Sequence, residues 1–147
     1  MTTMFDVDAS DLIKQAAQEL KKVAEMKAPV WTLVVKTGAH KERPPTQEDW
    51  WYLRSAAVLR KVALHGPLGA EKLRGHFGGK KNRGVRPGEY RKGSGSIARR
   101  VLQGLEKSGL IKKVEKDALR KGRLLTPKGR SFLDKAATVI AKGEKHG

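Results

Sequence analysis

The segment from 75 to 95 constrains the fold more than any other part of this chain, because it is rich in glycine and basic residues and almost lacks apolar side chains. Such a segment buries too little apolar surface to fold by itself. A loop of this length inside a compact domain is typically either functional or disordered. We therefore expect a basic Gly/Arg loop over 75–95 that becomes ordered on a bound polyanion. The core must then come from the chain on either side.

The N-terminal part of the chain predicts an amphipathic helix. Over 12–24 the apolar residues recur with helical spacing. Asp8 or Ser10 is placed to cap the start of this helix. Pro29 ends the pattern, and a short second helix is expected over 31–36, followed by a turn-rich segment.

Two further helices are expected before the basic loop. Thr46 and Asp49 resemble a capping box, with Asp in the position that Glu usually takes. The helix that they open runs over 49–65 and buries Trp51 in the core. A short helix over 68–74 then leads into the loop.

Three elements are expected after the loop. Ser94 or Ser96 is placed to cap a helix, and two short apolar runs around a charged turn predict a β-hairpin. Thr126 followed by Pro127 predicts the start of a last helix, because proline is favoured at the first helical position. The expected ranges are 96–108 for the first helix, 110–125 for the hairpin, 127–141 for the last helix and 143–147 for a flexible tail.

This order of elements predicts a mainly α, winged-helix-like domain with a small β-hairpin wing. We expect residues 1–147 to form a single domain, with 1–45 as an N-terminal helical elaboration. In a winged helix, the third helix is presented to nucleic acid and the wing lies beside it. Here these two elements are the helix over 96–108 and the hairpin over 110–125.

The charge of the chain points to a polyanionic partner. Its 32 Lys and Arg residues exceed its 15 Asp and Glu residues and give a formal net charge of +17. Such a field attracts nucleic acid before any specific contact forms. Most of the excess lies between residues 72 and 130, on the loop, the presented helix and the wing. The placement of charge therefore favours a nucleic-acid-binding domain over an unspecialised α+β domain.

Several other classes are disfavoured. With no cysteine in the sequence, disulfides and thiolate metal sites are ruled out. The four histidines lack the spacing of metal ligands, and no nucleophile, base and orienting group come together, so neither a metal, a cofactor nor an enzyme is expected. No apolar run approaches the roughly 20 residues of a membrane span. The acidic N-terminus does not resemble a signal peptide. We expect a soluble, cytoplasmic protein.

The candidate nucleic-acid contacts lie on the loop, the presented helix and the wing. Arg99 and Arg100 follow the helix start, where backbone N–H groups favour a phosphate. Tyr90 is a candidate for stacking on a base, whereas the helical aromatic residues are expected in the core. A long cationic loop before the helix would crowd entry into a DNA major groove, which favours RNA. The candidate RNA-binding residues are Lys80, Lys81, Arg83, Arg86, Tyr90, Arg91, Lys92, Ser94, Ser96, Arg99, Arg100, Lys112 and Arg123.

Several separated motifs resemble a known family, the archaeal and eukaryotic small-subunit ribosomal protein nineteen of the "e" type. The resemblance covers about 5–141. The middle of the 116–122 turn and the short C-terminal tail do not follow the family pattern, which leaves contacts of the wing tip open. The motifs are Trp50–Tyr52 with Arg54, Gly78–Pro87, Gly93–Gln103, Leu105-Glu106 and Arg123–Gly129.

The resemblance implies a winged-helix protein on the head of the small ribosomal subunit that contacts ribosomal RNA. In eukaryotic relatives it also implies a role in maturation of that RNA. The functional positions that it implies are Arg54, the loop over 79–87 and the Arg99-Arg100 pair. The expected partners are small-subunit ribosomal RNA and neighbouring small-subunit proteins, and the free protein is expected to be a monomer.

A second hypothesis is a winged-helix DNA-binding transcription regulator. The last helix is apolar enough on one face to dimerise, so this alternative stays open on the residues alone. The Gly/Arg loop and the family motifs favour the ribosomal interpretation.

Overall fold

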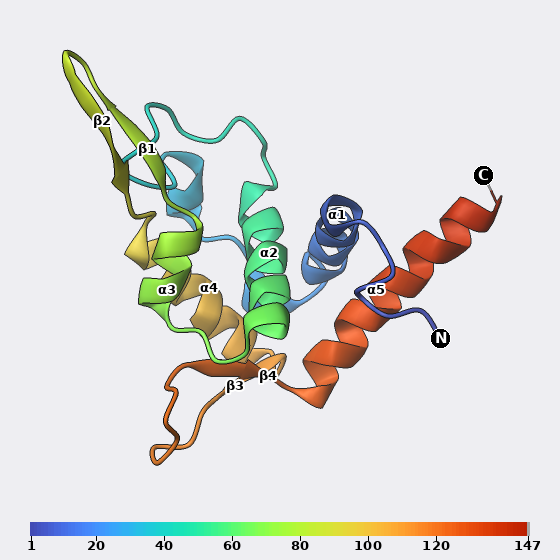
Figure 1. Ribbon diagram of the computed structural model, residues 1–147. Helices are drawn as coiled ribbons and strands as arrows, with labels where there is room; N and C mark the ends of the chain where they lie inside the picture. Colours follow the sequence, from blue (N-terminus) through green and yellow to red (C-terminus); the bar gives the residue numbers. More distant parts are fainter. Residues whose placement is uncertain (147) are drawn as a thin grey trace.

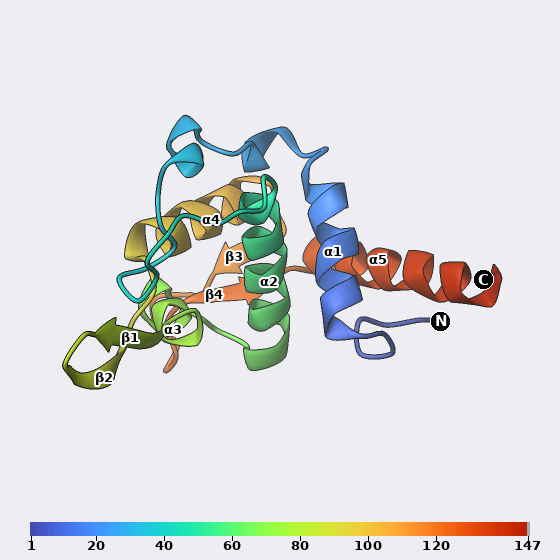
Figure 2. The ribbon, with the colours of Figure 1, turned by 90° about the horizontal axis from the view of Figure 1, so that it is seen from above.

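The computed structural model describes residues 1–146, which form five α-helices and two β-hairpins. Figures 1 and 2 show their arrangement in two views at right angles. Two short 3-10 helices, η1 (Ala24–Met26) and η2 (Val30–Leu33), follow the first helix. The helices are α1 (Ala9–Leu20), α2 (Trp50–His65), α3 (Ala70–His76), α4 (Gly95–Lys107) and α5 (Pro127–His146), and the strands are β1 (Gly79–Arg83), β2 (Arg86–Arg91), β3 (Ile111–Lys113) and β4 (Arg123–Leu125).

The centre of the fold is a winged helix built from α2, α3, α4 and the β3–β4 hairpin. The three helices bury Leu59, Leu73 and Leu102 completely in one apolar core. Strands β3 and β4 pair antiparallel directly after α4. Leu68, just before α3, exchanges backbone hydrogen bonds of 3.2 and 3.0 Å with Arg123 and so forms an isolated β-bridge to the wing. The predicted mainly α, winged-helix-like class is confirmed.

Helices α1 and α5 cover the winged helix on one side. Helix α1 packs against both α2 and α5 (Figure 2). Its inward face buries Leu12, Ala16 and Leu20, and α5 contributes Leu133 to the same core. Of the helices in the described part of the chain, none combines the length and apolar character that a bilayer crossing requires.

Helix α1 begins as predicted but ends earlier. The carboxylate of Asp8 accepts a hydrogen bond from the Ser10 N–H at 2.9 Å, which confirms the cap. The prediction that the helix continues to residue 24 is wrong, because the Val23 N–H bonds to the Leu20 carbonyl in a turn. The apolar pattern persists past the helix because Val23 still packs on the core.

The prediction of a short helix over 31–36 is also wrong, because the structure has a 3-10 helix there that begins and ends earlier. The structure forms η2, which begins after Pro29 and lasts a single turn. The Thr32 hydroxyl donates to the Pro29 carbonyl at 2.7 Å, and the Trp50 indole N–H donates to the Thr32 carbonyl at 3.1 Å. These local and tertiary bonds, rather than helical propensity, fix the segment.

The start of α2 differs from the predicted capping box. Asp49 is the N-cap, but its side chain makes no capping hydrogen bond. Its carboxylate instead pairs with the ammonium of Lys21 at 3.3 Å. The predicted capping box is wrong because the Asp49 carboxylate pairs with a cation at the end of α1 and so links α1 to α2.

The prediction of an irregular basic loop over 75–95 is wrong for its central part, which forms the β-hairpin of β1 and β2. Gly84 has φ of 73°, and it stands first in the two-residue turn between Arg83 and Arg86. The Asn82 side chain accepts from the Gly84 N–H at 3.0 Å. The hairpin forms without a core of its own, since β2 is exposed along its whole length. Backbone pairing, the cross-strand ion pair of Arg83 with Glu89 and the ion pair of Arg91 with Glu89 within β2 replace apolar burial here.

The elements after this hairpin follow the prediction more closely. The Ser94 hydroxyl accepts from the Ile97 N–H and caps α4, and the Thr126 hydroxyl accepts from the Gly129 N–H at the start of α5. Helix α5 continues past the expected residue 141, so the predicted tail is helical as far as His146. Gly147 lies outside the described residues.

We expect Trp51→Ala to destabilise the fold by about 3–5 kcal/mol, the usual cost of deleting a large buried aromatic side chain. Trp51 is 4% exposed, packs edge to face with Trp31 and Trp50, and donates its indole N–H to the Met26 carbonyl. Chemical denaturation followed by circular dichroism measures the loss. Trp51→Phe is the control that keeps an aromatic ring and should lose much less. A normal unfolding midpoint for Trp51→Ala would contradict the role of this ring in the core.

Candidate nucleic-acid interface

Helix α4 presents a cationic face to solvent. Its other face buries Ile97, Val101 and Leu102 in the core. Arg99 and Arg100 are exposed, and neither forms an ion pair with any residue in 1–146. Two unneutralised guanidinium groups near a helix start form a favourable setting for phosphate.

The two arginines of α4 lie on different sides of its axis. The Arg99 guanidinium lies close to Gly95, where a β-carbon would be 3.1 Å from it, and the side chain of Arg74 approaches the same glycine. Arg100 instead lines a pocket with Trp31 and Val35. The pair therefore extends the cationic surface in two directions, toward α3 and toward η2.

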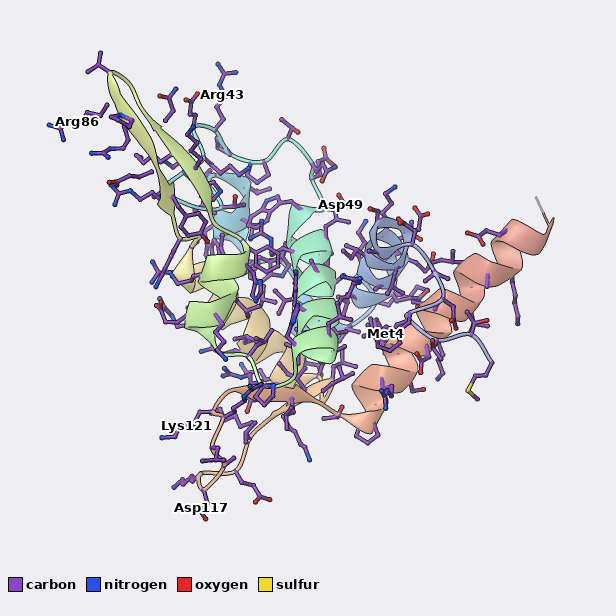
Figure 3. All side chains as sticks on the ribbon, viewed as in Figure 1. Met4, Arg43, Asp49, Arg86, Asp117 and Lys121 are labelled. Carbon is purple, nitrogen blue, oxygen red and sulfur yellow. The ribbon has the colours of Figure 1, made fainter. Side chains whose placement is uncertain are left out.

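The β1–β2 hairpin carries five of the predicted cations away from the body of the fold. Both hairpins extend from the side of the molecule that holds α3 and α4. The β1–β2 hairpin lies at one end of these two helices and the β3–β4 wing at the other (Figure 1). Arg83 and Arg91 each pair with Glu89 at 3.0 Å, whereas Arg86 points outward into solvent (Figure 3). The Lys81 ammonium donates to the Ala39 carbonyl at 2.9 Å. Lys80 and Arg86 form no ion pair within the described chain, so they keep the most available charge.

Tyr90 lies at the base of this hairpin rather than at its tip. Its hydroxyl donates to the Gly75 carbonyl, and its ring lies against Gly78. The side chain remains 57% exposed. Stacking of a base on Tyr90 stays a prediction, and the hydrogen bond shows that the residue also anchors the hairpin to the end of α3.

Lys92 joins an ion-pair cluster at the start of α3. Glu71 accepts from Lys92 at 3.0 Å and from Arg74 at 2.7 Å. The hydrogen bonds from Lys92 and then Arg74 lower the pKa of the Glu71 carboxyl. The Arg74 side chain also donates to the Gly93 carbonyl at 3.1 Å. Lys92 is therefore partly neutralised and helps to hold the second strand of the hairpin against α3.

Arg54 is set apart from the other predicted contacts. Its guanidinium lies over the Phe77 ring, 4.2 Å from the centroid, and burial lowers its pKa. No carboxylate among residues 1–146 pairs with it. The cation–π contact joins α2 to the end of α3.

Arg54 also lines a pocket that the sequence did not reveal. The pocket has a volume of about 480 Å³ and is lined by Lys41 and Arg43 from the turn-rich segment before α2. Figure 3 shows Arg43 on the same side of the molecule as the β1–β2 hairpin. No local motif marks Lys41 or Arg43, because only the path of the chain brings them beside Arg54.

Of the two predicted contacts on the wing, one is exposed and the other is partly covered. Lys112 is exposed on β3. The Arg123 side chain is only 19% exposed and pairs with Glu106 of α4 at 3.2 Å. Arg123 thus fastens the wing to α4, and its contact with RNA stays a prediction. Lys121 lies along the loop of the wing (Figure 3).

No group of His, Asp and Glu residues in the described chain is arranged to hold a metal ion. The polar side chains around α4 and the two hairpins are instead dominated by Lys and Arg. Together the fold and this surface define a winged-helix protein whose presented helix carries an exposed cationic face.

The chain belongs to the ribosomal protein S19e family, whose model matches residues 3–143. It is 45% identical to the small ribosomal subunit protein eS19 of Aeropyrum pernix, over 95% of this chain and 90% of that protein. The small ribosomal subunit protein eS19 of Haloarcula marismortui is 42% identical, over 93% and 90%. The eS19G protein of Ascaris suum is 39% identical, over 98% and 95%. The predicted family is confirmed, and the transcription-regulator alternative is not favoured.

We expect the folded protein to lose stability as the pH falls below about 6.5, the ordinary histidine value. Burial, then the charges of Lys41 and Arg54, lower the pKa of His40. Burial, then Lys61, His65 and Lys72, lower that of His76. The unfolded chain then binds more protons than the folded one in this window, so acid favours unfolding.

Thermal unfolding between pH 7.5 and 5 measures this dependence. The double variant His40→Gln with His76→Gln should show a flatter decline of the unfolding temperature than the unmodified protein. Equal slopes in the two proteins would contradict the assignment.

Proposed function

We propose that this chain is a structural constituent of the small ribosomal subunit that binds ribosomal RNA and supports assembly and maturation of the subunit. The observation that carries the proposal is the exposed, unneutralised Arg99-Arg100 pair on the presented helix of a chain with net charge +17. The names of the relatives, which are small ribosomal subunit proteins, support the same role. The chain acts in the cytoplasm on the ribosome, without catalysis.

The cations of α4 and those of the β1–β2 hairpin contact different phosphates in this proposal. Arg99 and Arg100 contact phosphates beside α4, while Lys80 and Arg86 extend the contact along the β1–β2 hairpin. The hairpin projects away from the start of α4, so the cations near its tip reach phosphates beyond those that α4 contacts (Figure 1). An extended set of phosphate contacts suits folded RNA, which a protein reads by shape and backbone. Neighbouring small-subunit proteins complete the site, and the free protein is a monomer.

Sedimentation of a cell lysate tests this role. After a wash at about 0.5 M salt, where loose electrostatic binding is largely screened, the tagged protein should remain with small subunits and translating ribosomes. Close to one copy per subunit is expected. Release to the top of the gradient would overturn the structural role, and co-purification with DNA would instead support a regulator.

We expect Arg99→Glu with Arg100→Glu to abolish incorporation into small subunits while the purified protein stays folded. The double change reverses the charge at the proposed phosphate contact, and both side chains are exposed. Lys135→Glu with Lys142→Glu on α5 is the matched control, because it makes the same change of charge at exposed positions away from α4. Incorporation is measured by sedimentation and folding by circular dichroism. Normal incorporation of the α4 variant would contradict the role of this pair.

A further inference from the structure

A pocket of about 430 Å³ lies between η2 and the start of α4. Its apolar wall is formed by Trp31, Val35 and Ile97, and its polar rim by Lys36, Ser96 and Arg100. The volume falls within the range of roughly 300–1,000 Å³ that small-ligand pockets occupy. None of the described residues that line it is acidic.

The walls of this pocket are held in place by bonds to the core. The Trp31 ring packs edge to face on Trp51, with centroids 5.6 Å apart and planes at 88°. The Ser94 N–H donates to the Thr37 carbonyl at 3.0 Å, which ties the segment after η2 to the N-cap of α4. The pocket is therefore largely formed before any ligand binds, which reduces the entropic cost of binding.

The pocket continues into a groove along the start of α4. A second hollow of about 370 Å³ shares Val35, Lys36 and Ser94 with it and extends to Lys92. Neither Lys36 nor Arg100 forms an ion pair within residues 1–146, so two available cations lie at one end of the groove.

The outer face of η2 beside this pocket is unusually apolar. Val30, Leu33 and Val34 are 85%, 77% and 74% exposed. An apolar patch next to an aromatic ring and two cations is complementary to a nucleotide, which has a flat base, a ribose and a phosphate.

We propose that this groove binds an unpaired nucleotide of the RNA held by the protein, with its base in the pocket. The inference rests on the proposed function and adds a base-recognition site to a surface that otherwise contacts phosphates. The base lies against Trp31 and Val35, the Ser96 hydroxyl meets its polar edge, and Arg100 with Lys36 holds the adjoining phosphate. Unpaired bases are the part of RNA that proteins read through stacking and edge contacts.

The charge on the rim favours a nucleotide over an apolar protein segment. A peptide that filled the apolar wall would place Lys36 and Arg100 against neutral groups unless it also carried acids. A nucleotide supplies the anion and the flat apolar surface in one unit.

A photochemical cross-link tests the proposal. The purified full-length protein is bound to small-subunit ribosomal RNA at about 0.3 M salt, where nonspecific binding is weakened, and irradiated with ultraviolet light. After digestion with nuclease and trypsin, a nucleotide adduct is expected on the peptide 28–36, which contains Trp31. Retention of RNA on a filter is measured in the same samples.

Ser96→Glu provides the sharper comparison. A carboxylate there opposes the phosphate at the rim, yet Ser96 is exposed in the first turn of α4, where an acid favours the helix. The adduct should fall about tenfold, since stacking and edge contacts with one base are worth a factor of this order. Ser131→Glu on α5 has the same charge change and should leave the adduct unchanged.

The outcomes separate the two proposals. RNA retained without an adduct on 28–36, or an adduct equally strong in Ser96→Glu, overturns the nucleotide site while RNA binding stands. A cross-link from this peptide to a protein instead of RNA in isolated small subunits also overturns it. Absence of retained RNA overturns the proposed function together with the site.

Discussion

The rest of the structure depends on the contacts of three tryptophan side chains around the start of α2, which pack on one another and hydrogen-bond to the preceding chain. Trp51 donates to the Met26 carbonyl and Trp50 to the Thr32 carbonyl, so the chain before α2 is pinned to the helix at two points. Trp31 packs on Trp51 from the same segment. Without these contacts, the segment from η1 to η2 would lose its attachment to α2. The groove beside α4 would then lose one of its walls.

The second constraint is electrostatic, because a chain of charge +17 must hold its cations near one another. Three glutamates each bridge two cations. Glu71 and Glu106 do so where a hairpin meets a helix, and Glu89 does so within the β1–β2 hairpin. These ion pairs are partly exposed, so each contributes modestly to stability, but together they fix which cations are neutralised. Arg99, Arg100, Lys80 and Arg86 remain outside them. Glu71 pairs with Arg74 and Lys92, Glu89 with Arg83 and Arg91, and Glu106 with Arg123 and Lys113.

Local patterns in the sequence predicted the helices and the wing, because their signals are short-ranged: apolar periodicity, the Ser94 cap and the Thr126-Pro127 start. The β1–β2 hairpin escaped prediction because its stability comes from pairing across strands and not from burial, although Gly84 after Asn82 is a turn signal that was present. The pocket at Arg54 escaped because Lys41 reaches it only through the tertiary path of the chain. Periodicity reports what faces a core, and it is silent about exposed strands and surface hollows.

The position of the β1–β2 hairpin bears on how α4 meets its partner. The hairpin leads directly into α4, and Tyr90 and Lys81 tie it to the end of α3 and to the segment before α2. A fixed cationic projection beside the presented helix hinders deep insertion of that helix into a duplex groove. It leaves the flanks of α4 as the accessible surfaces, one with Arg99 beside Arg74 and one with Arg100 beside Trp31. Folded RNA, with its phosphates and unpaired bases distributed over an irregular surface, meets such flanks more readily than regular B-DNA does.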